Sequence, residues 1–343
     1  MAKSTHILVI RLSAMGDVAM AVPVLRVLAQ TYSELKITVL SRPFFKPFFE
    51  DIPNLDFLEA DVYGEHKRFG LLKLANEAKD LGIDAVADLH NVIRSKIITK
   101  YLKFKGIDTA TLDKGRAEKK ALIAAKGEAI SQLKTTHQRY ADVFEKLGFP
   151  LNLGKHIAPP KKRLSPKLNG LLGVESKKLI GIAPFAAYQS KMYPLSLMAE
   201  VIRELDRTDK YRIFLFGGGK KEIKLLKEME IPFANVTNVA GKLSFEEELA
   251  LISNLDLMLS MDSGNGHLAA MYGVPVVTLW GVTHPYAGFV PFKQPDNNQL
   301  LSDCKEYPLI PTSIYGNKFP KGYDDAMKTI SPETVVQKVR ELL

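Results

Sequence analysis

Two glycine-containing turns constrain the fold of this chain more than any other feature. The first is Met15-Gly16-Asp17-Val18, and the second is Asp262-Ser263-Gly264-Asn265-Gly266-His267. Each follows an apolar run typical of a buried strand, at 7–12 and 255–260, and each leads into a helix-like stretch. In open α/β sheets, ligands bind where such turns leave the strands, because helix N-termini and backbone N–H groups converge there. The sequence therefore predicts two similar α/β halves, each presenting a polar loop to a ligand.

Strand-like and helix-like segments alternate through both halves of the chain. Strands are expected at 7–12, 37–40, 83–89, 179–183, 212–216, 236–240, 255–261 and 274–279. Helices are expected at 22–32, 71–81, 95–104, 244–252 and 331–343. Ser244 and Glu247 form a capping box at the start of one of them. This alternation is typical of βαβ units and parallel sheets, so the predicted class is α/β with doubly wound domains.

A region rich in proline and charge, at 154–178, interrupts the alternation and favours a linker. The length of 343 residues also favours two domains. We therefore expect a first domain at 1–160 and a second at 161–330. The helix at 331–343 is expected to pack back on the first domain.

Composition restricts the class of protein further. Hydrophobic residues make up 46% and charged residues 25%, which excludes disordered and fibrous classes. The single cysteine, Cys304, allows neither an intramolecular disulfide nor a cysteine-based metal cluster. With no signal peptide and no apolar run long enough to span a bilayer, we expect a cytoplasmic protein. The net charge of +9 predicts an anionic partner.

Four motifs follow one another over nearly the whole chain. They are Arg11-Leu12-Ser13-Ala14-Met15-Gly16-Asp17-Val18 followed by Pro23 and Leu25, Lys191-Met192-Tyr193-Pro194, Gly217-Gly218-Gly219 leading to Glu222, and Met261-Asp262-Ser263-Gly264 with His267-Leu268. With this ordered set the chain resembles glycosyltransferase family 9, the heptosyltransferases of lipopolysaccharide core synthesis. The resemblance implies the GT-B fold, in which two Rossmann-like domains face a central cleft. It also implies an inverting, metal-independent glycosyltransferase.

Asp17 is the candidate catalytic base. An inverting transfer needs a group that takes the proton from the acceptor hydroxyl as this attacks the anomeric carbon. The resemblance implies that role for Asp17, and it places Ser13, Met15 and Gly16 on the acceptor side. The alternative is that Asp17 caps the helix that follows it.

The downstream turn is the candidate donor site. The backbone N–H groups of Ser263, Gly264 and Asn265 are placed to receive a diphosphate at a helix N-terminus. Phosphates would repel Asp262, so we expect it to bind sugar hydroxyls. His267 is a further sugar or phosphate contact, or alternatively a helix residue satisfied by packing.

Three further residues complete the expected donor site. The resemblance implies that Lys191 neutralises the leaving diphosphate, and Ser190 is expected to add a phosphate hydrogen bond. It also implies that Glu222 holds the ribose hydroxyls. The alternatives are a solvated surface lysine for Lys191 and a first-turn helix glutamate for Glu222.

The sequence contains no recognisable metal-binding motif, Walker loop or dinucleotide fingerprint. The run Gly217-Gly218-Gly219 lacks the later glycine that such a fingerprint requires. We therefore expect no metal and no cofactor, only a nucleotide-sugar co-substrate. ADP-heptose is the leading donor by analogy, and other nucleotide sugars remain open.

Basic residues are concentrated between 91 and 139. They are Arg94, Lys96, Lys100, Lys103, Lys105, Lys114, Arg116, Lys119, Lys120, Lys126, Lys134 and Arg139. This surplus suits an anionic glycolipid acceptor at the inner membrane surface, with Arg94, Arg116 and Lys120 as contacts. The alternative is a solvated helical face. His90-Asn91 departs from the Gln-Gly usual in the family, which leaves the identity of the acceptor open.

Two other functions fit the same scaffold. One is a sugar-nucleotide epimerase or hydrolase, which would act on the donor without an acceptor. The other is a non-catalytic nucleotide-sugar-binding protein. Nucleic acid is not an expected partner, because no helix-turn-helix, zinc finger or aromatic RNA-binding signature is present. The oligomeric state does not follow from the sequence.

Overall fold

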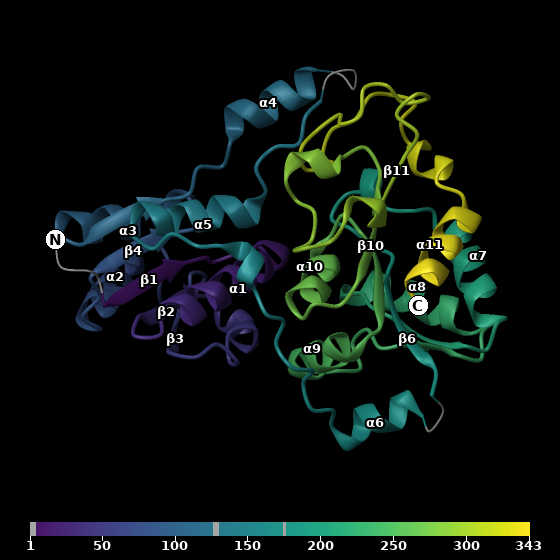
Figure 1. The fold of residues 1–343 in the computed structure, drawn as a ribbon, viewed down its shortest axis with the longest axis horizontal. Coiled ribbons are helices and arrows are strands. Elements are labelled where there is room, and N and C mark those ends of the chain that lie inside the picture. The colour runs from purple at the N-terminus through teal and green to yellow at the C-terminus, as the bar shows by residue number, and fades with distance from the viewer. Residues whose placement is uncertain (1–4, 126–129, 174–175) are drawn as a thin grey trace. The chain divides into compact units, whose positions relative to one another are not determined.

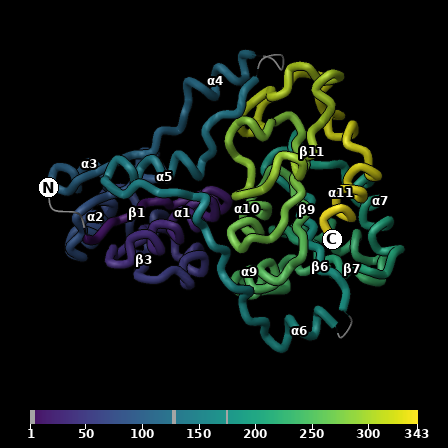
Figure 2. Tube along the Cα trace, viewed as in Figure 1, coloured from purple at the N-terminus to yellow at the C-terminus, as the bar shows by residue number. Residues whose placement is uncertain are grey.

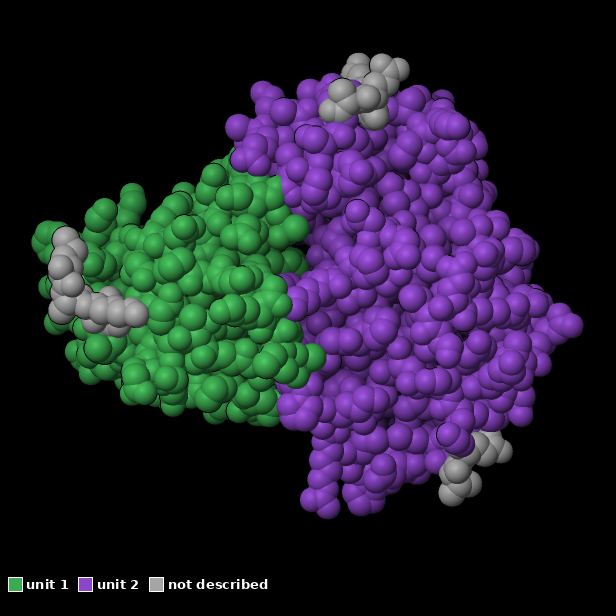
Figure 3. All heavy atoms as spheres, in the orientation of Figure 1, with its two compact units in different colours: residues 1–116, 134–158 green, residues 117–133, 159–343 purple. Residues whose placement is uncertain are grey.

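The computed structural model describes residues 5–125, 130–173 and 176–343 (Figure 1). The chain forms two compact units, coloured separately in Figure 3. Unit 1 comprises residues 1–116 and 134–158, and unit 2 comprises residues 117–133 and 159–343. The chain enters unit 2 first at residue 117 and again at residue 159, the second time inside the region expected to be a linker. Unlike the continuous first domain expected at 1–160, unit 1 does not include 117–133.

Unit 1 is built on a five-stranded parallel sheet with the order β3-β2-β1-β4-β5. Its strands are β1 (His6–Ile10), β2 (Lys36–Ser41), β3 (Leu55–Glu59), β4 (Ala85–Asp88) and β5 (Asp108–Thr111). Its α-helices are α1 (Met15–Thr31), α2 (Gly70–Asp80), α3 (Ile93–Phe104) and α5 (Thr136–Lys146). Because β1 lies between β2 and β4 and is buried throughout, its residues are nearly all apolar.

Unit 2 is built on a six-stranded parallel sheet with the order β11-β10-β9-β6-β7-β8. Its strands are β6 (Lys178–Ala183), β7 (Tyr211–Leu215), β8 (Val236–Asn238), β9 (Leu257–Met261), β10 (Val276–Trp280) and β11 (Gln299–Leu301). Its α-helices are α4 (Arg116–Ala124, in unit 2 beyond its first residue), α6 (Pro166–Leu172), α7 (Leu195–Asp206), α8 (Gly219–Glu230), α9 (Phe245–Asn254), α10 (Gly264–Met271) and α11 (Pro332–Leu342). Figure 2 follows this alternation along the chain.

Strand order fixes where each sheet can bind a ligand. In unit 1 the chain runs from β1 outward through β2 and β3, then returns to β4 on the other side of β1. In unit 2 it runs outward from β6 through β7 and β8 and returns to β9. The direction of winding therefore reverses between β1 and β4 and between β6 and β9. Such switch points leave a crevice at the carboxyl ends of the strands.

The C-terminal helix differs from the expectation in its packing. Helix α11 belongs to unit 2 and packs against α7, instead of packing back on the first domain. Its inner face carries Val335, Val336 and Val339, which are buried in the core of that unit together with Val201 and Leu205 of α7. The apolar face of the helix is thus covered within unit 2.

The region expected to be a linker contains a short helix. The Ser165 hydroxyl accepts a hydrogen bond from the backbone N–H of Leu168 at 3.3 Å, and Pro166 is the first residue of α6. A serine cap followed by proline is a helix start signal, so part of the region expected to be a linker is helical. The capping box of Ser244 and Glu247 is confirmed at the start of α9.

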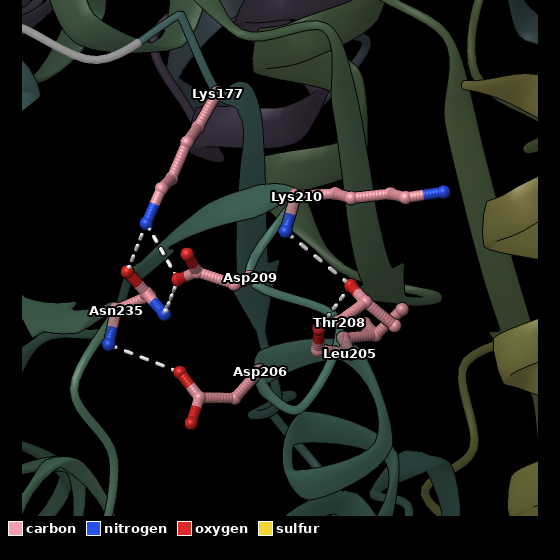
Figure 4. A network of polar contacts seen from close by, with 7 residues as sticks. All are labelled: Lys177, Leu205, Asp206, Thr208, Asp209, Lys210 and Asn235. Carbon is pink, nitrogen blue, oxygen red and sulfur yellow. Dashed lines mark hydrogen bonds and ion pairs between the residues drawn. The ribbon is translucent and has the colours of Figure 1, made fainter.

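A polar network joins three loops at the amino ends of the strands in unit 2 (Figure 4). Lys177, before β6, donates from Nζ to Asp209 Oδ1 at 2.7 Å and to Asn235 Oδ1 at 2.8 Å. Asn235, before β8, also donates from its backbone N–H to Asp206 Oδ1 at 3.0 Å. The network therefore fixes the edge of the sheet opposite to the glycine turns.

Candidate active site

Asp17 lies in the first turn of α1, just beyond the carboxyl end of β1. Its Oδ2 atom is 2.6 Å from Nη2 of Arg11 and accepts a long hydrogen bond, 3.4 Å, from the backbone N–H of Ala14. The side chain of Asp17 is 32% exposed, whereas that of Arg11 is 6% exposed. Among the described residues, none donates a hydrogen bond to Asp17 Oδ1. One oxygen is therefore held, and the other is available to a ligand.

Arg11 is the residue that holds Asp17, and no role for it was predicted from the sequence. Its Nη1 atom donates to the carbonyl oxygen of Leu89 at 2.6 Å, and its guanidinium lies 5.7 Å from the centre of the Tyr140 ring. The Tyr140 hydroxyl donates to the backbone oxygen of Asp17 at 3.3 Å. A charged residue at the end of an apolar strand was the signal available in the sequence. Arg11 and Tyr140 together fix the turn that carries Asp17.

The end of β4 contributes the neighbouring side chains. Asp88 is fully buried and accepts hydrogen bonds from the backbone N–H groups of His90, at 2.9 Å, and Asn91, at 2.8 Å. Burial, followed by the charges of Arg11 and Lys114, lowers the pKa of His90 to about 3. His90 is consequently a neutral imidazole at pH 7. The departure from Gln-Gly at this position thus places a neutral, buried side chain near Asp17.

The predicted acceptor residues fall into two groups. Ser13, Met15 and Gly16 lie in the same turn as Asp17 and are partly exposed. Arg94 is exposed at the start of α3, and its guanidinium lies 5.2 Å from the centre of the Tyr63 ring. Arg42, which follows β2, lies 5.2 Å from the same ring.

Arg116 and Lys120, the other predicted acceptor residues, are exposed on α4. Lys120 belongs to unit 2, so unit 1 does not gather every predicted acceptor contact.

The basic stretch is only partly a solvated face. Lys119 and Arg139 are buried: Lys119 Nζ lies 4.2 Å from the centre of the Phe289 ring, and Arg139 Nε donates to the Lys134 oxygen at 3.2 Å. Burial lowers the pKa of Lys114, and the charges of Arg11 and Arg116 add to that effect. Lys126 lies outside the described residues.

In unit 2, Lys191 and Asp262 form an ion pair at the carboxyl ends of β6 and β9. Lys191 Nζ is 2.9 Å from Asp262 Oδ2, and the Thr283 hydroxyl, beyond β10, donates to the same oxygen at 2.8 Å. The two side chains are only 12% and 10% exposed. Lys191 is therefore not the solvated surface lysine of the alternative interpretation. Asp262 binds the lysine directly, and Thr283 is a partner that the motifs did not reveal.

The first turn of α10 lies beside this pair. Ser263, Gly264 and Asn265 are partly exposed there, and His267 is buried. Within the described parts of the chain, the buried Oγ atom of Ser263 has no hydrogen-bond partner. The turn thus offers an unused hydroxyl together with the N-terminal N–H groups of a helix.

Two predicted donor residues are hydrogen-bonded to the protein backbone. Glu222 Oε2 accepts a hydrogen bond from the backbone N–H of Gly218 at 2.8 Å, as expected for a glutamate near a helix start. The Ser190 hydroxyl donates to the carbonyl oxygen of Gly316 and is buried. In this state its proton is therefore directed at the protein backbone.

Metal-binding clusters and membrane-spanning helices are both absent from the described ranges. No group of three or more His, Cys, Asp and Glu side chains there is arranged to hold a metal ion. None of the helices in those ranges combines the length and the apolar character needed to cross a membrane.

Comparison with known proteins gives a consistent result. Residues 71–308 match the sequence profile described as glycosyltransferase family 9 (heptosyltransferase). Lipopolysaccharide heptosyltransferase 1 of Campylobacter coli is 26% identical, over 98% of both chains.

Two solved structures share the fold. The family 9 glycosyltransferase of Veillonella parvula has a TM-score of 0.75 at 20% identity and covers 98% of this chain and 97% of its own. The Escherichia coli heptosyltransferase WaaC with ADP has a TM-score of 0.64 at 18% identity, covering 98% and 100%. The two parallel-sheet units are those of a GT-B protein, as the sequence predicts.

Proposed function

The chain belongs to glycosyltransferase family 9, the heptosyltransferases, and on that premise we propose that it transfers heptose, with inversion, from ADP-heptose to an anionic glycolipid of the lipopolysaccharide core type. The name of the Campylobacter coli relative supports the sugar and the lipopolysaccharide acceptor. The Escherichia coli heptosyltransferase, whose structure contains ADP, supports the nucleotide. The side chains described above support a mechanism for each half of the reaction.

The Lys191–Asp262 pair is the observation on which the donor half depends. In the transfer, the bond between the anomeric carbon and the diphosphate oxygen breaks, and its electron pair stays on that oxygen. The Lys191 ammonium, already held at 2.9 Å from Asp262, neutralises this charge together with the N-terminal N–H groups of α10. Asp262 Oδ1 remains to accept a hydrogen bond from a sugar hydroxyl. Because lysine and helix supply the neutralisation, the proposed reaction needs neither metal nor cofactor.

The acceptor half depends on Asp17. Its Oδ1 atom takes the proton from the acceptor hydroxyl, while the hydroxyl oxygen forms the new bond to the anomeric carbon on the face opposite the leaving group. Arg11 holds Oδ2, which leaves Oδ1 as the oxygen that meets the substrate. The neutral His90 adds no positive charge that would compete for the carboxylate.

The charges around this edge of unit 1 support an anionic acceptor. Arg42 and Arg94 approach the same Tyr63 ring, and Lys114 lies close enough to Arg11 and Asp17 to interact with them electrostatically. Guanidinium groups bind phosphate and carboxylate with two parallel hydrogen bonds. An acceptor anchored in a bilayer implies that the enzyme works at the inner face of the cytoplasmic membrane, as a peripheral protein.

Titration calorimetry with ADP, UDP, GDP and CDP tests the donor site. We expect selective binding of ADP that is weakened roughly ten- to hundredfold in Lys191→Ala, since a charge-assisted hydrogen bond is lost. Lys227→Ala, an exposed lysine in the last turn of α8, is the control and should bind as the wild type does. Selective binding of another nucleotide would contradict ADP-heptose as donor, and absence of binding would contradict the transferase.

A further inference from the structure

A loop far along the chain covers Lys191. Residues 312–318, which we call the 312–318 loop, are joined to the segment that follows β10 by a hydrogen bond from the Thr312 N–H to the Val282 oxygen at 3.0 Å. The Val282 N–H in turn donates to the Ser190 oxygen at 3.2 Å, and the Ser190 hydroxyl donates to the Gly316 oxygen. Three segments distant in sequence therefore form one hydrogen-bonded unit around Ser190–Lys191.

Gly316 makes the closest approach. Its φ of +79° lies in the left-handed region, and a Cβ atom there would lie 2.5 Å from Cδ and 2.6 Å from Cγ of Lys191. It would also lie 3.1 Å from the Ser190 hydroxyl oxygen. Real Cβ contacts are not this short, so any other residue at 316 would displace the stem of Lys191. The absence of a side chain at 316 is what lets that stem lie flat against the loop.

The consequence is that Lys191 is held at both ends before any ligand binds. Gly316 covers its methylene groups, and Asp262 binds its ammonium at 2.9 Å. A free lysine side chain loses rotamer entropy when it is fixed. A lysine that is already fixed binds an anion without that loss, as in other preorganised sites.

We propose that the 312–318 loop is a positioning element of the diphosphate site and that it acts through Gly316 on Lys191. The inference rests on the proposed function, because it assigns a partner to the lysine that neutralises the leaving group. Gly316 is a positioning residue in this assignment and does not itself touch the substrate.

Gly322 provides a matched control in the same segment. Its φ is +89°, and a Cβ atom there would meet nothing within 4 Å. Alanine at either position suffers the same kind of backbone strain. Gly316→Ala alone also pushes on Lys191, so the difference between the two variants isolates the contact.

The experiment is a titration of ADP into the 343-residue protein and four variants. The variants are Gly316→Ala, Gly322→Ala, Lys191→Ala and the double variant of Gly316→Ala with Lys191→Ala. We expect Gly316→Ala to bind ADP about tenfold more weakly than Gly322→Ala. Once Lys191 is alanine, we expect Gly316→Ala to weaken ADP binding no further, so that the double variant binds ADP as Lys191→Ala does. Such non-additivity is not produced by a loop that is merely structural.

Three results would overturn the inference. The first is equal affinity of Gly316→Ala and Gly322→Ala for ADP. The second is a loss of ADP affinity on Gly316→Ala that is the same whether residue 191 is lysine or alanine. If Gly316→Ala does not fold, Thr312→Val takes its place, because it removes the 2.7 Å hydrogen bond from the Thr312 hydroxyl to the Lys318 oxygen. We expect Thr312→Val to weaken ADP binding a few-fold. Wild-type affinity for ADP in that variant is the third result that would overturn the inference. A wild type that binds no nucleoside diphosphate is a different outcome, because it contradicts the proposed function itself.

Discussion

Arg11 is buried at the end of an apolar strand, and its contacts explain how a cation is tolerated there. It pairs with Asp17, donates to the Leu89 oxygen and packs near the Tyr140 ring. Removing the Asp17 carboxylate would leave the buried charge of Arg11 without its counter-ion. Burying an unpaired charge is costly, so such a change would also destabilise the protein. Asp17, the proposed base, is therefore best altered by an isosteric substitution such as Asp17→Asn.

His90 gives this cluster a measurable pH dependence. Its pKa is about 3 in the folded protein and 6.5 in an ordinary environment, so between these values the unfolded chain binds a proton that the folded protein does not. The free energy of unfolding should therefore fall as the pH drops from about 6.5 towards 3. We expect His90→Gln to reduce the loss between pH 7.5 and 4.5 by about 2–3 kcal/mol, measured by chemical denaturation.

A direct readout is the imidazole signal of His90 in an NMR titration, assigned through the same variant. We expect a neutral ring from pH 8 down to about pH 5. Protonation of His90 with a midpoint near 6.5 would contradict this expectation. So would a free energy of unfolding that falls equally with pH in the wild type and in His90→Gln.

The residues of the candidate site were predictable where a local motif carries them. Asp17 and Asp262 lie at the carboxyl edges of sheets, as the turn pattern indicated, and Lys191 was found through the motif shared with the family. Arg11, Thr283 and Gly316 escaped assignment because each acts through a residue distant in sequence or through tertiary packing. A spacing pattern in one sequence does not record such contacts.

At the scale of elements, burial explains which strands were predictable. The interior strands β1, β2, β4, β6, β7, β9 and β10 are mostly buried, and their apolar runs predicted them. The strands that sequence reasoning missed, β3, β5 and β11, all lie at sheet edges and are short and partly exposed. An edge strand covers less of the core, so it shows no continuous apolar run.

Substitution within the network in Figure 4 should lower thermal stability without weakening ADP binding. Lys177→Met leaves Asp209 and Asn235 without their shared donor, so we expect the thermal midpoint to fall by roughly 2–4 °C. Lys178→Met is the control, because the Lys178 side chain is 53% exposed, against 12% for Lys177, and its ion pair with Asp256 is longer, at 3.5 Å, so it should contribute little. ADP affinity should stay at the wild-type value in both variants, since the network lies at the opposite edge of the sheet. Weakened ADP binding in Lys177→Met would contradict this separation.

At the scale of the whole molecule, the two units carry different parts of the proposed reaction. Unit 1 holds Asp17, the proposed base, at the switch point between β1 and β4, and unit 2 holds the proposed diphosphate-binding turn at the switch point between β6 and β9. A change at Asp17 should therefore stop transfer and spare ADP binding, whereas a change at Lys191 should weaken both. Dependence on the acceptor distinguishes a transferase from an epimerase or hydrolase, because neither of these would need an acceptor.

The most direct test measures the release of ADP from ADP-heptose, with and without a heptose-deficient lipopolysaccharide core as acceptor. The proteins compared are the wild type, Asp17→Asn and the control Asp56→Asn. Asp56 is a surface acid whose side chain is 64% exposed. We predict that the wild type and the control release ADP only when the acceptor is present, and that the product carries the inverted anomeric configuration. Asp17→Asn should be slower by about 10²–10⁴-fold and should bind ADP nearly as the wild type does. Wild-type turnover in Asp17→Asn, or ADP release that needs no acceptor, would contradict the proposed transferase mechanism.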